Sequence, residues 1–340
     1  MISMSNFTSR RADGAGFVAI ALLCAVTLSG CDGPLSALDP AGQSADEIHR
    51  LFWWMTGGGI VIWLTFVGMT YFAVRISPQP HDPRQTEFWI IGGGAVVPTI
   101  VLTGLLVYGL EMLPRMVRPA PPGSLQIDVT GLQWWWRVEY RLPEGGTVET
   151  ANEIRLPVGE PVQFHLKSAD VIHSFWIPSL GGKVDMIPGR ETRLTLEPNR
   201  TGTFRGICAE YCGASHALMA FDVVVMTRPE FDAWLTEQQR DGIDPADATA
   251  ERGRDVFVMR GCGACHTIRG TTSDGRAGPD LTHVGSRLSL GAGTLSNDPH
   301  GFGRWVAETS SEKPSVKMPD FRMLAAEELE ALATYLEGLQ

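Results

Sequence analysis

The sequence is poor in charged residues, and basic residues are in deficit among them. Its 340 residues include 28 Lys and Arg against 38 Asp and Glu, which gives a net charge of −10. This balance excludes a general nucleic-acid-binding protein, which carries a surplus of basic residues. At 19% charged and 44% hydrophobic residues, the chain is also too apolar to be disordered. The length predicts two or three domains, and the mean hydropathy of +0.01 is compatible with an average over unlike parts.

Cysteine is scarce as well. The six cysteines lie at positions 24, 31, 208, 212, 262 and 265, so the last four form two close pairs. This spacing favours metal or haem attachment over a disulfide framework.

Residues 1–30 have the features of a secretory signal peptide of the lipoprotein type. Two arginines precede an apolar stretch over 17–28 that is too short to cross a bilayer. The stretch ends in the sequence LSGC at 28–31, which resembles the bacterial lipobox. The resemblance implies that Cys31 is lipidated and becomes the first mature residue. The alternative is an ordinary signal peptide with a chance cysteine.

Two longer apolar runs, Leu51–Val74 and Phe88–Leu110, follow an external segment over 31–50. Each exceeds the roughly 20 residues that cross the hydrocarbon core, so we expect a transmembrane hairpin over 51–113. Flanking basic residues do not decide its orientation. An exported N-terminus followed by two spans places residues 112–340 on the outer or periplasmic side of a bacterial inner membrane.

A stiff Pro- and Gly-rich stretch over 119–123 separates the hairpin from a region with a different pattern. Residues 125–129, 162–166 and 193–196 alternate apolar and polar side chains between Gly and Pro turns. Short strands at such spacing predict a β-sandwich or barrel, which we place at 124–237. This region with the following linker, 124–248, holds 18 acidic and 11 basic residues, a charge that would attract a basic electron donor.

Soft ligands are concentrated in residues 208–219, CAEYCGASHALM. Two thiolates, an imidazole and a thioether fall within twelve residues, a set that favours copper over magnesium or calcium. A structural zinc site is the first alternative, although zinc rarely takes Met and no second Cys or His pair is nearby. A disulfide between Cys208 and Cys212 is the second alternative.

A second pair forms Cys262-Gly263-Ala264-Cys265-His266, the pattern of c-type haem attachment. Two thiols add to the haem vinyl groups, and the adjacent His266 becomes the proximal axial ligand. A redox dithiol is the alternative, but the following His and the exported location argue against it.

Residues 208–219 resemble, at every position, the dinuclear copper (CuA) loop of subunit II of haem-copper cytochrome c oxidases, Cys-x-Glu-x-Cys-x-x-x-His-x-x-Met. That family implies a cupredoxin-like Greek-key β-sandwich for 124–237. It also implies that two coppers are bridged by two thiolates and completed by weaker ligands. The implied ligands are Cys208, Glu210 (through its carbonyl oxygen), Cys212, His216, Met219 and the distant His173. His165, the nearby competitor, is expected to be structural.

The same resemblance implies roles for residues around the copper loop. Trp134 matches the exposed tryptophan that receives electrons from the donor, although Trp135 stands where the family usually has Tyr. An ordinary aromatic core is the alternative. The Glu210 side chain would reach a magnesium ion at the contact with subunit I, which residues 183–190 would face. Asp170 corresponds to an acidic residue for donor docking, and Glu87 to an acidic residue before the second span.

Residues 249–340, joined by a polar linker over 238–248, resemble an all-α class I cytochrome c domain. The resemblance implies Met318 as the sixth ligand, with Met323 as the fallback, and a Met ligand raises the haem potential relative to two His ligands. The sequence GPDL at 278–281 resembles the loop whose Pro carbonyl orients the proximal His. Helices are expected over 249–260 and 325–339. With 12 acidic and 10 basic residues, this domain is nearly neutral, so its net charge would not attract it to the acidic copper domain.

Together these features resemble subunit II of a caa-type oxidase with a fused cytochrome c. The implied cofactors are CuA, covalent haem c and a magnesium ion at the subunit I interface. Expected partners are subunit I, subunit III, membrane lipid and an external donor, a cytochrome c or a bc complex, and no nucleic acid. The alternatives are a CuA-bearing nitric oxide or nitrous oxide reductase component and a non-enzymatic copper carrier or assembly protein. The quinol-oxidase branch is disfavoured because its subunit II generally lacks these copper ligands.

Overall fold

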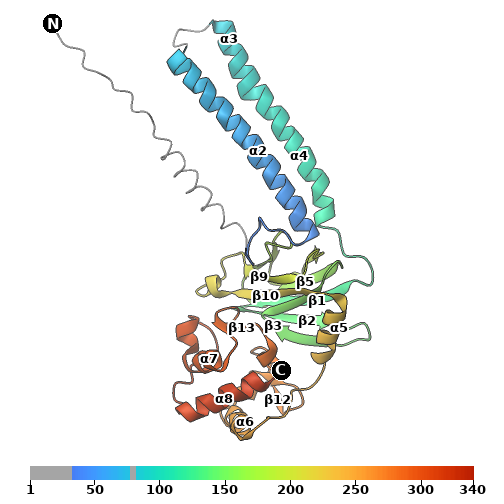
Figure 1. The fold of residues 1–340 in the computed structure, drawn as a ribbon, viewed down its shortest axis with the longest axis vertical. Helices are drawn as coiled ribbons and strands as arrows, with labels where there is room; N and C mark the ends of the chain where they lie inside the picture. The colour runs from blue at the N-terminus through green and yellow to red at the C-terminus, as the bar shows by residue number, and fades with distance from the viewer. Residues whose placement is uncertain (1–32, 77–81) are drawn as a thin grey trace, which may run out of the picture.

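The computed structural model describes residues 33–76 and 82–340. The predicted signal peptide over 1–30 and the predicted lipidation site Cys31 lie outside the described residues. Three parts follow one another along the long axis of the molecule (Figure 1). A helical hairpin occupies one end, a β-sheet module the middle and a helical module the other end.

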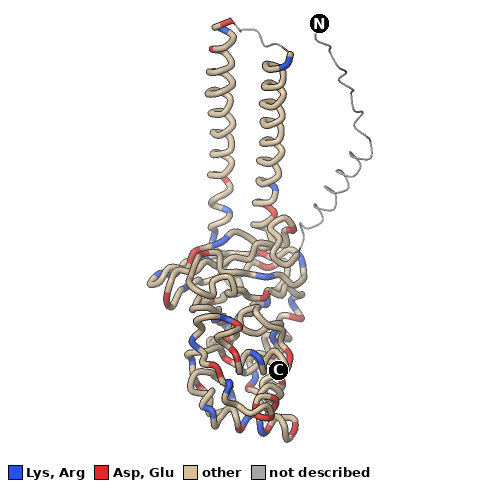
Figure 2. The backbone as a smooth tube through the Cα atoms, turned by 90° about the vertical axis from the view of Figure 1, so that its left-hand side faces the viewer, with Lys and Arg blue, Asp and Glu red and all other residues tan. Residues whose placement is uncertain are grey.

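The hairpin consists of two long, continuous helical segments. The first is α2 (Gln43–Tyr71) with a π-helical turn η2 (Phe72–Ile76), and the second runs through α3 (Pro83–Phe88), η3 (Trp89–Val96) and α4 (Val97–Met116). Each segment of 34 residues is long and apolar enough to cross a membrane, and its apolar side chains are exposed. Charged residues are confined to the ends of the hairpin (Figure 2).

The first helix begins at Gln43, eight residues before the apolar run, because its base is attached to the β-module. Gly42 forms a β-bridge with Pro198, and a side chain at Gly42 would come within 2.5 Å of the Leu180 carbonyl oxygen. Asn199 donates a 2.6 Å hydrogen bond to Asp46 in the first turn. The predicted external segment 31–50 is therefore in part the first turns of the membrane helix.

The middle module is a sandwich of two five-stranded sheets, with strand orders β3-β2-β1-β5-β8 and β4-β10-β9-β6-β7. Each predicted alternating segment is a strand, because one face of each lies in the core: Ile127 and Val129 are fully buried while Asp128 points outward. The strands are β1 (Leu125–Leu132), β2 (Trp135–Arg141), β3 (Thr147–Ala151), β4 (Glu153–Pro157), β5 (Val162–Ser168), β6 (His173–Trp176), β7 (Val184–Met186), β8 (Thr192–Leu196), β9 (Gly202–Cys208) and β10 (Ala220–Met226).

Aromatic rings join the two sheets of the sandwich. Phe175 of β6 stacks on Phe221 of β10 at 4.9 Å between ring centroids, and Trp136 of β2 meets both edge-on. All three side chains are fully buried. Buried aromatic pairs hold their neighbours in fixed positions. Strand β6 begins at His173, and β10 follows directly after the loop that carries the soft ligands.

A short helix and the linker lead from the sandwich to the C-terminal module. Helix α5 (Arg228–Glu237) packs Phe231 and Trp234 against Tyr140 of the sandwich. The linker is not free: Arg269 of the C-terminal module donates to the carbonyl oxygens of Gln238 and Arg240.

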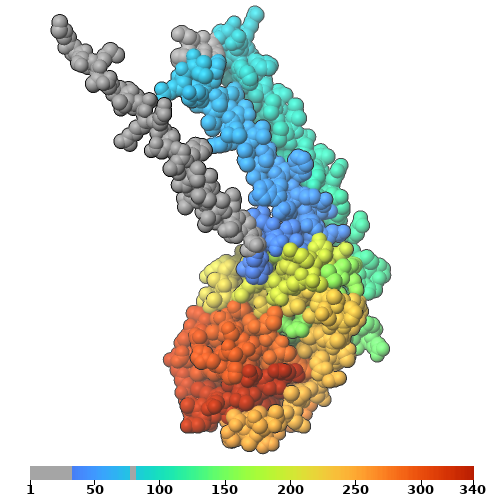
Figure 3. All heavy atoms as spheres, in the orientation of Figure 1, coloured from blue at the N-terminus to red at the C-terminus, as the bar shows by residue number. Residues whose placement is uncertain are grey.

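The C-terminal module is built around three helices, α6 (Ala248–Met259), α7 (Pro299–Glu312) and α8 (Ala326–Gly338). Helices α6 and α8 lie within one residue of the predicted ranges, whereas α7 was not predicted. Gly253 allows α6 and α8 to cross closely, since a side chain there would lie 2.0 Å from the Ala331 carbonyl oxygen. The remaining elements are short: η5 (Cys262–Ala264), β11 (Thr267–Ile268), β12 (Ser273–Asp274), η6 (Val284–Ser286), β13 (Ser289–Leu290) and β14 (Leu295–Ser296). The module packs directly on the β-sandwich (Figure 3).

Candidate copper and haem sites

The soft ligands converge because the sheet brings two distant segments together. Cys208 ends β9, and its neighbour β6 pairs with it at Phe175, two residues after His173. The chain then turns through η4 (His216–Leu218) before entering β10. A side chain at Gly131 would lie 2.8 Å from the His173 ring, so only glycine fits behind this imidazole. His173, Cys208 and Cys212 are all buried.

The distances in this cluster are those between ligands of shared metal ions. The two sulfur atoms are 3.8 Å apart, and His173 Nδ1 lies 3.9 Å from Cys208 Sγ. On the other side, His216 Nδ1 and Met219 Sδ lie 3.6 and 3.8 Å from Cys212 Sγ. With metal–sulfur bonds of about 2.3 Å, two ligands on one tetrahedral ion stand about 3.8 Å apart.

A disulfide is not what this geometry shows. Its sulfur–sulfur bond is about 2.05 Å long, and Cys208, Cys212, Cys262 and Cys265 are all free thiols. The backbone carbonyl oxygen of Glu210 lies 3.2 Å from Cys208 Sγ, in reach of the same cluster. The Glu210 side chain is exposed and points away from the core. The donor set of two thiols, two imidazoles, a thioether and a carbonyl therefore fits a copper pair.

The two thiols have opposite pKa shifts because they share one negative charge. Hydrogen bonding by the Cys212 thiol, with help from His173, lowers the pKa of Cys208. Its hydrogen bond to that thiolate, together with burial, raises the pKa of Cys212. A second thiolate at 3.8 Å is stable only with cations between the sulfur atoms. The site is thus poised to bind metal cations and release a proton.

Asp170 has contacts in the structure that the sequence did not indicate. Its carboxylate accepts hydrogen bonds from His173 Nε2 at 2.8 Å and from the Gln133 backbone N–H at 2.8 Å. These donors, including the Val171 N–H, outweigh burial and lower the pKa of Asp170. Both carboxylate oxygens bond within the domain, and the donor-docking role of Asp170 stays a prediction. The carboxylate fixes the ring so that Nδ1 faces the thiols, as carboxylates behind metal-bound histidines do.

Trp134 departs from the expectation of an exposed indole. Its side chain is only 6% exposed, because the indole N–H donates to the Cys212 carbonyl oxygen at 3.0 Å. The Gln133 side chain donates to the same oxygen at 2.8 Å. Trp134 therefore lies against the copper loop rather than on the surface. Gln133 and Gly131 were missed from sequence; the only signal was their place beside the aromatic patch.

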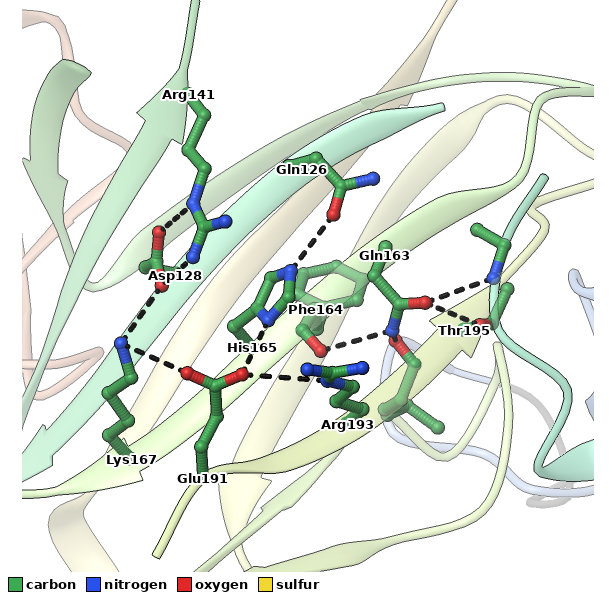
Figure 4. Close-up of polar contacts among 12 residues, drawn as sticks. Gln126, Asp128, Arg141, Gln163, Phe164, His165, Lys167, Glu191, Arg193 and Thr195 are labelled. Carbon is green, nitrogen blue, oxygen red and sulfur yellow. Dashed lines mark hydrogen bonds and ion pairs between the residues drawn. The ribbon is translucent and has the colours of Figure 1, made fainter. Parts of the chain in front are cut away.

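His165 lies outside the copper cluster, as expected. Its two ring nitrogens bond Glu191 and Gln126, each at 2.9 Å, on the outer face of the first sheet (Figure 4). Glu191 also pairs with Lys167 at 3.3 Å, and Lys167 with Asp128. This polar cluster links β1, β5 and β8 and is structural.

The haem-attachment motif forms a second convergent site. The ring of His266 donates from Nδ1 to the Pro279 carbonyl oxygen at 2.8 Å, which confirms the predicted role of that loop. Burial lowers the pKa of His266, so the ring is neutral with Nε2 free to bind iron. Gly278 is required beside it, because a side chain there would come within 2.5 Å of the ring. These features fit a covalently bound haem.

The two candidate sixth ligands differ in their surroundings. Met318 is partly buried and packs against the core of the cytochrome-like module, whereas Met323 is 70% exposed. Partial burial beside the core favours Met318, which remains a prediction.

Comparisons with known proteins match the β-sandwich and the C-terminal module to two separate families. The family described as cytochrome c oxidase subunit II, periplasmic domain, matches residues 141–227, and the cytochrome c family matches residues 250–340. Cytochrome c oxidase subunit 2 of Bacillus subtilis (strain 168) is 31% identical over 345 residues, which cover 94% of this chain and 96% of the relative.

Two further matches are shorter. Cytochrome c oxidase subunit 2 of Alkalihalophilus pseudofirmus is 40% identical over 217 residues, covering 64% of this chain and 62% of the relative. This alignment thus spans less than two thirds of that protein. The crystal structure of the periplasmic domain of subunit II of cytochrome oxidase of Bradyrhizobium japonicum is 34% identical, with a TM-score of 0.33. It covers 36% of this chain and 97% of that one.

Proposed function

This chain belongs to the cytochrome c oxidase subunit II family, and on that basis we propose how its two redox modules divide the work. It is the subunit through which electrons enter a terminal oxidase, and oxygen is reduced in subunit I. Its family implies a CuA centre, and its C-terminal module implies haem c. When bound, these groups supply reversible one-electron transfer from an external donor, a cytochrome c or a bc complex, toward subunit I.

The observation that carries the proposal is the convergence of the soft ligands. The side chains of Cys208, Cys212, His173, His216 and Met219 would hold the copper pair, together with the carbonyl oxygen of Glu210. Asp170 orients His173, and the buried position of the cluster keeps water from the metals. A rigid set of ligands changes little when an electron arrives, which favours fast transfer.

The cytochrome module would hold its haem through Cys262 and Cys265, and His266 and Met318 would bind the iron. The Pro279 carbonyl oxygen keeps His266 in the tautomer that binds iron. We assign Trp134, which touches the copper loop, to the passage of electrons toward copper from within the protein, since its indole is covered.

The protein is anchored to the membrane by its hairpin. We propose that it lies in the bacterial inner membrane, with both redox modules outside and Cys31 lipidated. Subunit I contacts the chain, and we add subunit III as a further partner. The exposed Glu210 side chain is available for a magnesium ion at the subunit I contact, which residues 183–190 face.

The test is spectroscopy and turnover of the purified complex. We expect an electron paramagnetic resonance signal with one electron shared over two coppers, a covalent haem by pyridine haemochrome, and oxygen uptake with a reduced donor. Cys208→Ser should abolish the copper signal and leave the covalent haem. Loss of both would contradict the two-module assignment.

Two rivals give other results. A nitric oxide or nitrous oxide reductase component would show the shared copper signal with reduction of its own substrate and no oxygen uptake. A copper carrier would show a single-copper signal and exchangeable metal.

A further inference from the structure

The cytochrome module directly contacts the copper loop, residues 208–219. Ser215, between two proposed ligands, donates from its hydroxyl to the Pro314 carbonyl oxygen at 2.5 Å. The Ala220 N–H, directly after Met219, donates to the Ala292 carbonyl oxygen at 3.2 Å. Ser215 is 1% exposed, so this contact excludes water. Val316 packs against the core of the sandwich in the same region.

Two elements of the cytochrome module make this contact. The first is the tight turn between β13 and β14. Gly291, Ala292 and Gly293 all have positive φ, at 61°, 64° and 78°. Such a run of left-handed residues makes a narrow tip with outward carbonyl oxygens. Arg205 of β9 donates to the Gly293 carbonyl oxygen at 2.7 Å, and a side chain at Gly293 would come within 2.5 Å of that guanidinium. The tip therefore fits closely on the sandwich.

The second element is the segment from Lys313 to Val316, which leads into Met318. The Lys313 ammonium donates to the carbonyl oxygens of Leu218 and Gly291, each at 2.8 Å. One acceptor belongs to the copper loop and the other to the turn. The side chain is 1% exposed, and among the described residues no carboxylate lies within ion-pair distance of it. A buried amine needs hydrogen-bond partners, and both partners of Lys313 lie at the contact between the modules.

We propose that Lys313 is a positioning residue that clamps the cytochrome module onto the copper loop. It holds the Met318 segment against residues 215–218, so that the two redox centres work across one preformed contact instead of by repeated encounters. The electron-transfer part of this inference rests on the proposed function, whereas the clamp itself does not.

Other contacts between the modules differ in burial: the Leu288 N–H donates to the buried Glu153 carboxylate at 2.7 Å, whereas the ion pairs of Arg276 are exposed. Arg276 pairs with Glu139 at 3.5 Å and with Glu149 at 3.1 Å, but its side chain is 66% exposed. Exposed pairs weaken with salt, whereas a buried contact is screened far less. Docking through Lys313 is therefore expected to be insensitive to ionic strength.

The test uses the purified oxidase complex with Lys313→Met, which keeps the side-chain length and removes the donors. Lys317→Met, at an exposed lysine one residue after this segment, is the matched control, and Arg276→Gln tests the exposed ion pairs between the modules. Two quantities are measured: hydrogen–deuterium exchange of segments 215–218 and 313–316, and the rate of haem-to-copper electron transfer after photoreduction, at low and high salt.

For the wild type and Lys317→Met we expect slow exchange and a rate independent of salt, and for Arg276→Gln nearly the same. Lys313→Met should exchange faster in both segments and transfer electrons about tenfold more slowly, because two buried acceptors lose their partner. Its rate should also fall with salt, while the haem and copper spectra stay unchanged. Lys313→Gln, which keeps one donor group, should lie between the two.

Wild-type exchange and rate in Lys313→Met would overturn the clamp. If Lys313→Met lost haem or copper altogether, Lys313→Gln would decide, and a wild-type profile in that variant would also count against the clamp. If the wild type lacked the shared copper signal, the proposed function would fail, and the exchange measurement would still report on the clamp.

Discussion

At the residue scale, the structure adds a role for Asp170 behind the His173 ring. Asp170→Asn removes the charge that His173 needs and places an amide beside the Gln133 N–H. Losses of this kind behind a metal ligand typically cost about 10- to 100-fold in metal affinity. We expect such a loss in a copper titration against a competing chelator. Asp185→Asn, at an exposed aspartate of the same module, is the control. Equal affinity in the two variants would contradict the role.

A second residue-scale prediction concerns the sixth haem ligand. Met318→His should lower the haem potential, because a Met ligand raises the potential relative to a second His. Met323→His, at a 70% exposed position, should leave it unchanged. A redox titration of the haem absorbance measures both. The opposite pattern would assign Met323 as the ligand.

The ligands in one loop could be predicted from sequence because their spacing is itself the signal. Asp170 and Trp134 could not be placed, because the direction of a carboxylate or an indole depends on partners elsewhere in the chain. Here those partners are His173 and the Cys212 carbonyl oxygen. Lys313 gave no local signal either, since both of its acceptors are backbone oxygens of distant residues.

At the element scale, the crossing of α6 and α8 depends on one glycine. Gly253→Ala would drive a methyl group into the Ala331 carbonyl oxygen. Overpacking of this kind costs about 1–3 kcal/mol in the free energy of unfolding. Gly303→Ala, in α7 with open space around it, should be neutral or stabilising. Denaturant unfolding followed by the haem absorbance compares the two, and equal midpoints would contradict the packing argument.

The polar cluster on β1, β5 and β8 predicts a response to acid. Hydrogen bonding by His165, with Lys167, lowers the pKa of Glu191 to about 2, well below its ordinary value of 4.5. Because the folded-state pKa is the lower one, the contribution to stability is complete above pH 4.5 and disappears as the pH falls toward 2. Thermal midpoints of the wild type should fall across this window, and those of Glu191→Gln should fall less. If the thermal midpoints of the two proteins fell equally with pH, the polar cluster would not be the cause of the acid destabilisation.

Strands and helices with a clear period could be predicted from sequence, and the shorter elements could not. The alternation at 125–129 marks β1 because one face of this strand is core. Helix α7 was not predicted from the sequence, because its periodic apolar residues are few and its last turns depart from helical geometry at Glu308. The start of α2 at Gln43 depends on Gly42 and Pro198, which meet only in the folded chain.

At the scale of the whole molecule, the three modules could be predicted and their arrangement could not. Net charge gave no reason for the nearly neutral cytochrome module to dock on the acidic sandwich. The structure joins them through individual contacts, such as Arg276 with Glu149 and the buried Lys313. Counts of charge describe the field around a domain, whereas docking depends on where each group lies.

The arrangement also makes the orientation in the membrane testable. Both redox modules lie at the same end of the hairpin, opposite the end where η2 finishes and α3 begins (Figure 1). Arg75 and Arg84 lie at that opposite end, and the apolar spans carry almost no charge. If that opposite end is cytoplasmic, both modules are outside, where covalent haem attachment takes place. Protease added to right-side-out vesicles should then degrade the haem-stained band, and inside-out vesicles should protect it. A cytoplasmic marker enzyme controls for vesicle integrity, and protection in right-side-out vesicles alone would reverse the topology.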